Sequence, residues 1–323
     1  MMKNIQVMIV MLSISTAFLF AGKPTAFKLP TTFPKDSIAL VNLPKEFTHF
    51  SVRDFTMSPN KDEIFFTVES NKNTIATIIQ LKKINGQWHM DIAPFSGNYY
   101  DLEATFAPDG KTLYFVSNRP LQKDSAIKDF DIWKTEKVNG IWQAPKNLGT
   151  IINTAADEFY PSVTNNGTIY FTAQYINSKG KEDIWMSKLE NGNYTSPVSV
   201  SDSVNSVKYE FNAYVAPDES IIIFTSFGRE DDLGGGDLYI SKKDAYGNWT
   251  KAKNLGSKIN SGSLDYCPFI SFDKQFFVFT SNRSKLQKSY KNKLSLNSFL
   301  REIGQLQNGK GNLYWINALE VFK

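Results

Sequence analysis

Residues 107–120 read APDGKTLYFVSNRP, a reverse turn followed by a run of strand-forming residues. Pro, Asp and Gly are the residues that turns favour, and the β-branched and aromatic residues after them favour strands. Related turns end at residues 61, 110, 167, 219 and 274, so the pattern occurs five times at steps of 49, 57, 52 and 55 residues. A period near fifty made of short strands is typical of a β-propeller with one four-stranded blade per repeat.

The second strand of each repeat is almost continuously apolar, which predicts that neighbouring blades cover both of its faces. These segments are 63–67, 112–116, 168–172, 221–225 and 276–280. The third and fourth strands are expected to meet at Asn-Gly turns, at 85–86, 139–140 and 191–192, because both residues of a type I′ turn need positive φ. An aromatic residue two positions after each Gly of this turn is expected to pack between blades: Trp88, Trp142, Tyr194 and Trp249.

The last repeat offers only three strands, the third at 312–316. Residues 37–41 have no other partner, so we expect them to supply the fourth strand and close the ring without a free sheet edge. The predicted fold is all-β, a five-bladed β-propeller closed by an N-terminal strand. A six-bladed ring is the alternative, and it needs about fifty more residues of the same pattern. Residues 22–323 are expected to form one domain with an insertion at 284–311.

The first 21 residues are expected to be a signal peptide, with Lys3 before an apolar stretch of 14 residues at 7–20. A periplasmic or secreted location follows, and an uncleaved membrane anchor is the alternative. No later stretch predicts a membrane-spanning segment. The net charge of +4 gives no argument for nucleic acid. The single cysteine, Cys267, excludes an intramolecular disulfide and is expected to be a buried thiol.

Charged residues recur at fixed positions of the repeat and should line one mouth of the central channel. The entrance of the innermost strand carries four carboxylates: Asp101, Glu158, Glu210 and Asp265. Two positions later stand Asp54, Glu103, Tyr160, Asn212 and Cys267. Arginines follow the second strand of three blades: Arg119, Arg229 and Arg283. Three further acids open the third strand: Asp131, Asp183 and Asp237.

Two interpretations of these charges stay open. They form a polar cup that binds a ligand or partner, or they are structural joints in which each carboxylate accepts backbone N–H bonds and pairs with an arginine. We prefer the structural interpretation, because every blade needs the same joint whereas a site usually needs one. The sequence predicts no metal site and no cofactor.

Signals for catalysis are few. The chain has two histidines, His49 and His89, outside the recurring positions, and it has no Gly-x-Ser-x-Gly motif. Two carboxylates at one mouth could make a glycosidase, although no pair stands out in the sequence. The chain is therefore predicted not to be an enzyme. A carbohydrate-active hydrolase or lyase that uses carboxylates at the propeller mouth is the alternative.

The insertion at 284–311 carries a run of basic residues that includes Lys285, Lys288, Lys291, Lys293 and Arg301. Leucine, isoleucine and phenylalanine recur between 296 and 306 at helical spacing, which predicts a short amphipathic helix. We expect this insertion over or beside the mouth, as a binding element or as a solvated excursion.

The turn at 107–110, with the following SNRP at 117–120 and DIW at 131–133, resembles the WD40-like (PD40) repeats of TolB-type propellers over about residues 50–320. The resemblance implies an exported bacterial propeller, a non-enzymatic binding or scaffold protein of the cell envelope. Its expected partner is an unknown envelope protein or a glycan, and the chain is expected to be a monomer.

Overall fold

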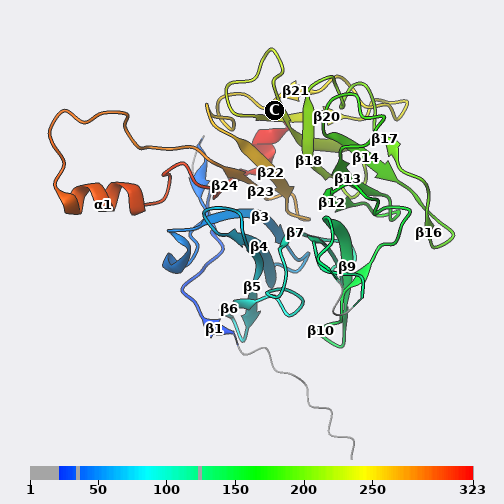
Figure 1. Ribbon diagram of the computed structural model, residues 1–323, viewed down its shortest axis with the longest axis horizontal. Helices are drawn as coiled ribbons and strands as arrows, with labels where there is room; N and C mark the ends of the chain where they lie inside the picture. Colours follow the sequence, from blue (N-terminus) through cyan, green and yellow to red (C-terminus); the bar gives the residue numbers. More distant parts are fainter. Residues whose placement is uncertain (1–21, 34–36, 123–125, 323) are drawn as a thin grey trace, which may run out of the picture.

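Five small sheets surround a common axis in the computed structural model, which describes residues 22–33, 37–122 and 126–322 (Figure 1). We number the blades I to V in chain order. The prediction of an all-β, five-bladed propeller is confirmed. The predicted signal peptide lies outside the described residues. No helix within the described ranges is long and apolar enough to cross a bilayer.

Each blade is an antiparallel sheet whose first strand lies nearest the axis. Blade I has β3 (Ser51–Met57), β4 (Glu63–Glu69), β5 (Ala76–Ile84) and β6 (Gln87–Ile92), with β1 (Lys23–Pro24) at its outer edge. Blade II has β7 (Asp101–Phe106), β8 (Thr112–Ser117), β9 (Asp131–Val138), β10 (Ile141–Trp142) and β11 (Lys146–Asn147). Blade III has β12 (Glu158–Val163), β13 (Ile169–Ala173), β14 (Asp183–Ser187) and β17 (Val198–Ser199), beside a small ribbon of β15 (Leu189–Glu190) and β16 (Asn193–Tyr194). Blade IV has β18 (Tyr209–Val215), β19 (Ile221–Phe227), β20 (Asp237–Lys242) and β21 (Lys253–Asn254).

Blade V joins the two ends of the chain. It has β22 (Asp265–Ile270), β23 (Phe276–Ser281), β24 (Asn312–Asn317) and the N-terminal β2 (Ala39–Leu40). In this sheet Ala39 pairs with Trp315 and Leu40 with Tyr314. The predicted closure is therefore confirmed, although the closing strand has two residues rather than five. One short 3₁₀ helix, η1 (Lys45–Phe47), follows β2 in the chain, and another, η2 (Ala318–Val321), follows β24.

The predicted hairpins are present in blades I and II, whereas in blade III the turn at 191–192 joins β15 and β16, outside the four-stranded sheet. The predicted aromatic packing is present as well. Asn139 and Gly140 have φ of 50° and 78°, the positive values that a type I′ turn needs. Trp142 is buried between blades I and II, with ring centroids 5.9 Å from Phe65 and 6.0 Å from Phe106. Offset and edge-on aromatic contacts of this kind hold neighbouring blades together.

The insertion forms the predicted helix, α1 (Leu296–Gly304). Figure 1 shows α1 outside the ring at the left, connected by two extended segments, and not over the axis. Of the two positions expected for the insertion, the structure therefore shows the one beside the ring.

Candidate active site

The acids at the entrance of the innermost strands are bound within their own blades. Asp101 accepts hydrogen bonds from Ser117 Oγ at 2.6 Å and from Arg119 Nη2 at 2.7 Å. It also accepts from Ser96 Oγ at 2.9 Å, in the segment that arrives from blade I. Arg119 in turn donates to the Phe95 carbonyl at 2.8 Å. This set of bonds, which we call a joint, fastens each blade to the chain segment that precedes it.

Blades IV and V repeat the joint. Arg229 donates to Glu210 at 2.9 Å, and Arg283 donates to Asp265 at 2.7 Å. The second carboxylate oxygens are also engaged, because Ser206 N and Ser261 N donate to these two acids at 2.8 and 2.6 Å. All four entrance acids have no exposed surface. Their bonding is what a structural joint requires, and it leaves little for a ligand.

The joint of blade III lacks an arginine. Tyr175 Oη donates to Glu158 at 2.9 Å in its place, and Thr154 Oγ1 donates at 2.7 Å. Burial raises the pKa of Glu158 to about 7, because hydrogen bonds from hydroxyl and amide groups offset only part of the desolvation.

The acids that open the third strands have local partners as well. Asp131 accepts from Lys128 Nζ at 2.9 Å and from Asn147 Nδ2 at 2.7 Å. Asp183 accepts from Lys179 N at 2.7 Å, and Asp237 accepts from Asn254 Nδ2 at 2.6 Å. The ten residues that the sequence singled out are thus distributed over four blades in separate clusters.

The residues two positions after the entrance acids lie together at the axis instead. Asp54, Glu103, Tyr160, Asn212 and Cys267 all have left-handed backbone, with φ between 48° and 58°. Each lies at a β-bulge, where the register of the innermost strand against its neighbour shifts. A bulge of this kind re-aims a side chain, and non-glycine residues in this conformation often mark functional sites.

Arg53 connects the acids of this axial cluster. Its Nε donates to Asp54 Oδ1 at 2.7 Å and its Nη2 to Glu103 Oε1 at 2.5 Å. Its Nη1 lies 3.6 Å from Glu69 Oε1, so three carboxyl groups share one guanidinium. The guanidinium also lies over the Tyr266 ring, 5.2 Å from its centroid.

Glu103 is the acid with the most unusual environment. Tyr160 N donates to its Oε2 at 2.7 Å, and Asn212 Nδ2 donates to its Oε1 at 3.2 Å. Burial raises the pKa of Glu103 to about 8; Arg53 opposes the shift and the nearby Asp54 charge adds to it. Glu103 therefore titrates closer to neutral pH than an ordinary glutamate does.

A pocket of about 260 Å³ opens onto Glu103, and every blade contributes to its wall. Its lining residues are Arg53, Leu102, Glu103, Phe159, Thr172, Glu182, Phe211, Asn212, Leu264 and Tyr266. Glu182 is the second carboxyl group of this axial pocket. Burial and the charge of Asp157 raise its pKa. Two carboxyl groups in different surroundings are the arrangement that acid–base chemistry uses.

The axial cluster is a poor cation site. Ligand atoms of Asp54, Glu103 and Cys267 lie within 4.8 Å of one another, which is close enough to hold an ion. Cys267 Sγ donates to Asp54 Oδ1 at 2.8 Å, however, and burial raises the pKa of this thiol well above its ordinary value. The Arg53 guanidinium already supplies the positive charge that a metal ion would bring.

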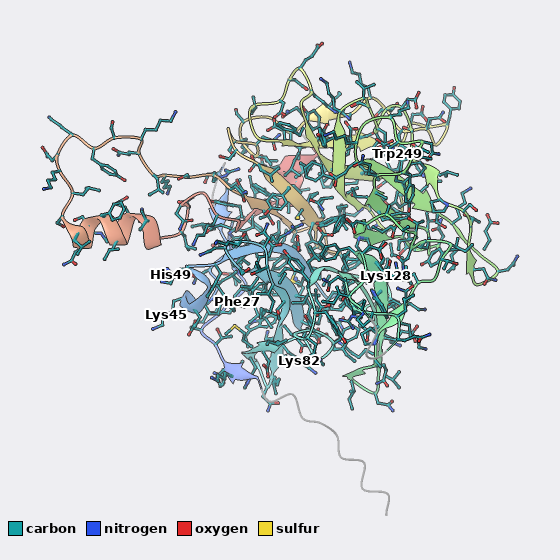
Figure 2. The ribbon with its side chains drawn as sticks, viewed as in Figure 1. Phe27, Lys45, His49, Lys82, Lys128 and Trp249 are labelled. Atoms are coloured by element: carbon teal, nitrogen blue, oxygen red, sulfur yellow. The ribbon has the colours of Figure 1, made fainter. Side chains whose placement is uncertain are left out.

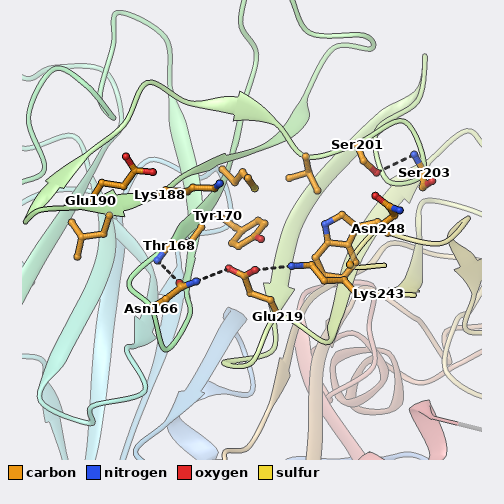
Figure 3. A pocket seen from close by; sticks show the side chains of 15 residues that line it. Asn166, Thr168, Tyr170, Lys188, Glu190, Ser201, Ser203, Glu219, Lys243 and Asn248 are labelled. Carbon is orange, nitrogen blue, oxygen red and sulfur yellow. Dashed lines mark hydrogen bonds and ion pairs between the residues drawn. The ribbon is translucent and has the colours of Figure 1, made fainter. Parts of the chain in front are cut away.

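A larger pocket, of about 630 Å³, lies between blades III and IV (Figure 3). At its centre Glu219 accepts from Lys243 Nζ at 2.6 Å and from Asn166 Nδ2 at 3.4 Å. Burial acts to raise the pKa of Glu219, but the hydrogen bond and charge of Lys243 outweigh it and lower the pKa. This carboxylate is ionised and paired, so the larger pocket offers no comparable proton donor.

No family model and no curated protein matches this chain. The resemblance to TolB-type repeats therefore stays a prediction. Among solved structures, the chain is similar to the catalytic domain of an α-L-arabinofuranosidase from Coprinopsis cinerea, at 10% identity and a TM-score of 0.46, over 92% of this chain and 97% of that one. It is similar to an oligogalacturonate lyase in complex with manganese, at 11% identity and a TM-score of 0.42, over 85% and 68%.

A puromycin-hydrolyzing peptidase from Mycobacterium tuberculosis is similar at 8% identity and a TM-score of 0.41, over 75% of this chain. The chain spans 36% of the length of that peptidase. At these identities the likeness shows the fold alone.

The prediction that the chain is not an enzyme is corrected: a hydrolase, a lyase and a peptidase share its fold, so the fold does not exclude catalysis. That prediction relied on missing motifs and on the lack of a distinguishable carboxylate pair. The structure shows what the sequence did not, namely that Glu103 and Glu182 both line the axial pocket. The sequence did contain a signal for Glu103: at its position in the repeat, the residue type differs from blade to blade.

Proposed function

We propose that the chain is a carbohydrate-active hydrolase whose reaction takes place in the axial pocket, with Glu103 as the proton donor. The observation that carries this proposal is a carboxyl group with a pKa of about 8 in the wall of an open pocket. A general acid works best when its pKa lies near the working pH, and such shifts concentrate at functional sites.

The walls of the axial pocket suit a sugar. Phe159, Phe211 and Tyr266 supply aromatic surface for the C–H faces of a pyranose or furanose ring, and Asn212 and Thr172 offer hydrogen-bonding groups for hydroxyls. A volume of about 260 Å³ suits one or two sugar units rather than a folded protein segment.

In the proposed reaction the Glu103 proton passes to the glycosidic oxygen as the bond from this oxygen to the anomeric carbon breaks. A water molecule bonds to that carbon and gives its proton to the carboxylate form of Glu182, the other acid of the pocket. Proton exchange with solvent then restores both groups. Arg53 and Asp54 are positioning residues in this scheme, because they hold Glu103 and set its charge environment.

The experiment is a hydrolysis assay on a panel of aryl glycosides and plant and bacterial polysaccharides between pH 4 and 10. We expect a bell-shaped profile that falls above about pH 8, where Glu103 loses its proton. Glu103→Gln should lower kcat by roughly 10²- to 10⁴-fold, the usual contribution of a general acid, and keep the fold.

Glu158→Gln is the matched control, because Glu158 is another buried glutamate with a raised pKa but lies in a joint. It should retain activity. Equal losses in the two variants, or a folded wild type that cleaves no glycoside in the panel, would contradict the proposal.

A further inference from the structure

The insertion between β23 and β24 has a fixed base and a projecting tip. At the base, Ser284 and Asn308 form a β-bridge, and Lys285 N donates to the Gln307 carbonyl at 2.8 Å. Lys310 Nζ donates to the carbonyl of His49, which Figure 2 labels on the ring side of the insertion, at 2.7 Å. Beyond these contacts the chain leaves the ring and carries α1 into solvent.

Helix α1 has an apolar face that nothing in the described chain covers. Leu296, Phe299, Leu300 and Ile303 follow the spacing of one helical face. Their exposed fractions are 71%, 48%, 52% and 43%, and no residue of the helix is buried. Ser295 caps the helix by accepting a hydrogen bond from Ser298 N.

Positive charge surrounds this face. Lys285, Lys288, Lys291 and Lys293 lie on the segment that leads to α1, and Arg301 lies in its last turn. Glu302 is the one acidic residue in the sequence of the insertion. These five basic side chains are exposed and form no ion pair with any residue for which the structure gives a position. The insertion therefore presents an apolar helix face beside a segment whose positive charges are not paired with acids.

We infer that residues 284–311 dock this protein onto an anionic lipid surface. The apolar face of α1 lies among the acyl chains just below the headgroups, and the lysines contact anionic headgroups above it. A nine-residue helix is about 14 Å long, too short to span a bilayer, so it lies in the interface. Tyr290, with 36% exposure, is the kind of side chain that favours the headgroup level.

A lipid surface fits these features better than a protein groove does. The face consists of leucine, isoleucine and phenylalanine without a polar group that would fix a register. A fluid apolar phase accepts such a face whatever its shape. The basic residues are spread along a loop rather than placed at one spot, which suits a diffuse negative surface.

Docking in this way leaves the axial pocket open. None of the residues that line the pocket belongs to 284–311, and α1 stands outside the ring. The inference does not depend on the proposed hydrolase activity, because binding and catalysis are measured separately.

The test is co-sedimentation of the full chain with vesicles of phosphatidylglycerol and phosphatidylethanolamine, compared with vesicles of phosphatidylcholine alone. We expect at least tenfold stronger binding to the anionic vesicles, weakened by raising the salt concentration from 50 to 500 mM. Replacing Leu296, Phe299, Leu300 and Ile303 with serine should abolish binding. Replacing Lys285, Lys288, Lys291 and Lys293 with glutamine should weaken it at least tenfold.

The matched controls make the same number and type of substitutions elsewhere on the protein. Serine replacements at four exposed apolar positions elsewhere, Ile127, Ile176, Val207 and Leu233, should leave binding unchanged. Glutamine at Lys72, Lys146, Lys251 and Lys253 changes the net charge by the same amount at exposed sites on the propeller and should have little effect.

Insertion depth gives a second measurement. Native Cys267 is fully buried, so a cysteine introduced by Leu300→Cys can be labelled selectively with an environment-sensitive dye. Its emission should shift to the blue on anionic vesicles, and a label at Asn297→Cys should shift less. Absence of vesicle binding overturns the inference. So does equal binding by the α1 serine variant. Concentration-dependent self-association that only the α1 serine variant loses would identify a second copy as the occupant instead.

Discussion

Two columns of the repeat, only two residues apart in the chain, have opposite roles. The joint column repeats one chemistry: in blades II, IV and V an acid at the strand entrance is held by a serine and by the arginine that follows the second strand. The axial column repeats a backbone conformation and changes its chemistry in every blade. In a closed repeat, recurrence of a side chain therefore indicates a shared mechanical need. Variation at a recurring, strained position indicates a site that is assembled once.

The largest difference between the two columns is expected when their arginines are removed. Arg53→Met leaves Asp54, Glu69 and Glu103 without a counter-ion and should lower the free energy of unfolding by about 3–5 kcal/mol at pH 8. The loss should be smaller at pH 5, where the buried carboxyl groups can take up protons. Urea unfolding at the two pH values measures both effects.

Arg283→Met is the matched variant in a joint. Asp265 keeps its hydrogen bonds from Ser261 N and Oγ, so the expected loss is about 1–3 kcal/mol. A loss at Arg53 that is no larger than at Arg283, or that does not depend on pH, would mean that the axial acids are not electrostatically coupled through Arg53.

Substituting one acid from each column should distinguish the two columns by the effect on activity. Asp101→Asn removes the ion pair with Arg119 and should cost about 1–3 kcal/mol of stability, while kcat per folded molecule stays near the wild-type value. Glu103→Gln should do the reverse, because the amide keeps the size of the side chain but cannot act as the proton donor. Thermal melts and the hydrolysis assay on the same samples decide it. Loss of activity in Asp101→Asn with full stability would move the catalytic role to the joint.

The fold was predictable because its signals are local. Turn residues, apolar second strands and Asn-Gly hairpins each act over a few residues, and their fivefold repetition fixed the blade count. The short outer strands β17 and β21 were not predictable, since each has only two residues and so little pattern.

The axial site was not predictable from strand alternation. In a regular strand, residues 101 and 103 face the same side. The bulge between Leu102 and Thr105 breaks this period, so Asp101 turns to its joint and Glu103 to the axis. Glu182 lies just before β14 and reaches the axial pocket only through the packing of blade III. The sequence shows which residues recur at this position, but not the left-handed backbone that turns their side chains toward the axis.

The dependence of stability on pH gives a smaller effect. Glu103 and Glu158 have folded pKa values of about 8 and 7, both above the ordinary glutamate value of 4.5. Between pH 4.5 and 8 the folded protein binds more protons than the unfolded chain, so their contribution to stability is complete below pH 4.5 and is lost as pH rises to about 8. Urea midpoints should therefore fall across this window.

Glu158→Gln should flatten the part of this decline between pH 4.5 and 7, because the variant has no proton to lose there. In the equivalent joint of blade IV, Glu210→Gln removes the partner of Arg229 and should destabilise at all these pH values. A decline in Glu158→Gln as steep as in the wild type would show that the arginine-free joint does not hold its proton.

The smallest expected effect concerns Asn212, whose Nδ2 donates to Glu103 Oε1 and favours the ionised form. Asn212→Gly removes this donor and should raise the pKa of Glu103, moving the alkaline limb of the activity profile up by as much as about one pH unit. Glycine also adopts the φ of 49° without strain, so stability should change by less than about 1 kcal/mol. Lys274→Gly is the matched control, because Lys274 has a φ of 56° in the turn of blade V and does not contact Glu103. It should leave the pH profile unchanged. If the limb moves equally in both variants, backbone flexibility rather than the hydrogen bond controls it, and Asn212 belongs to the scaffold rather than to the axial site.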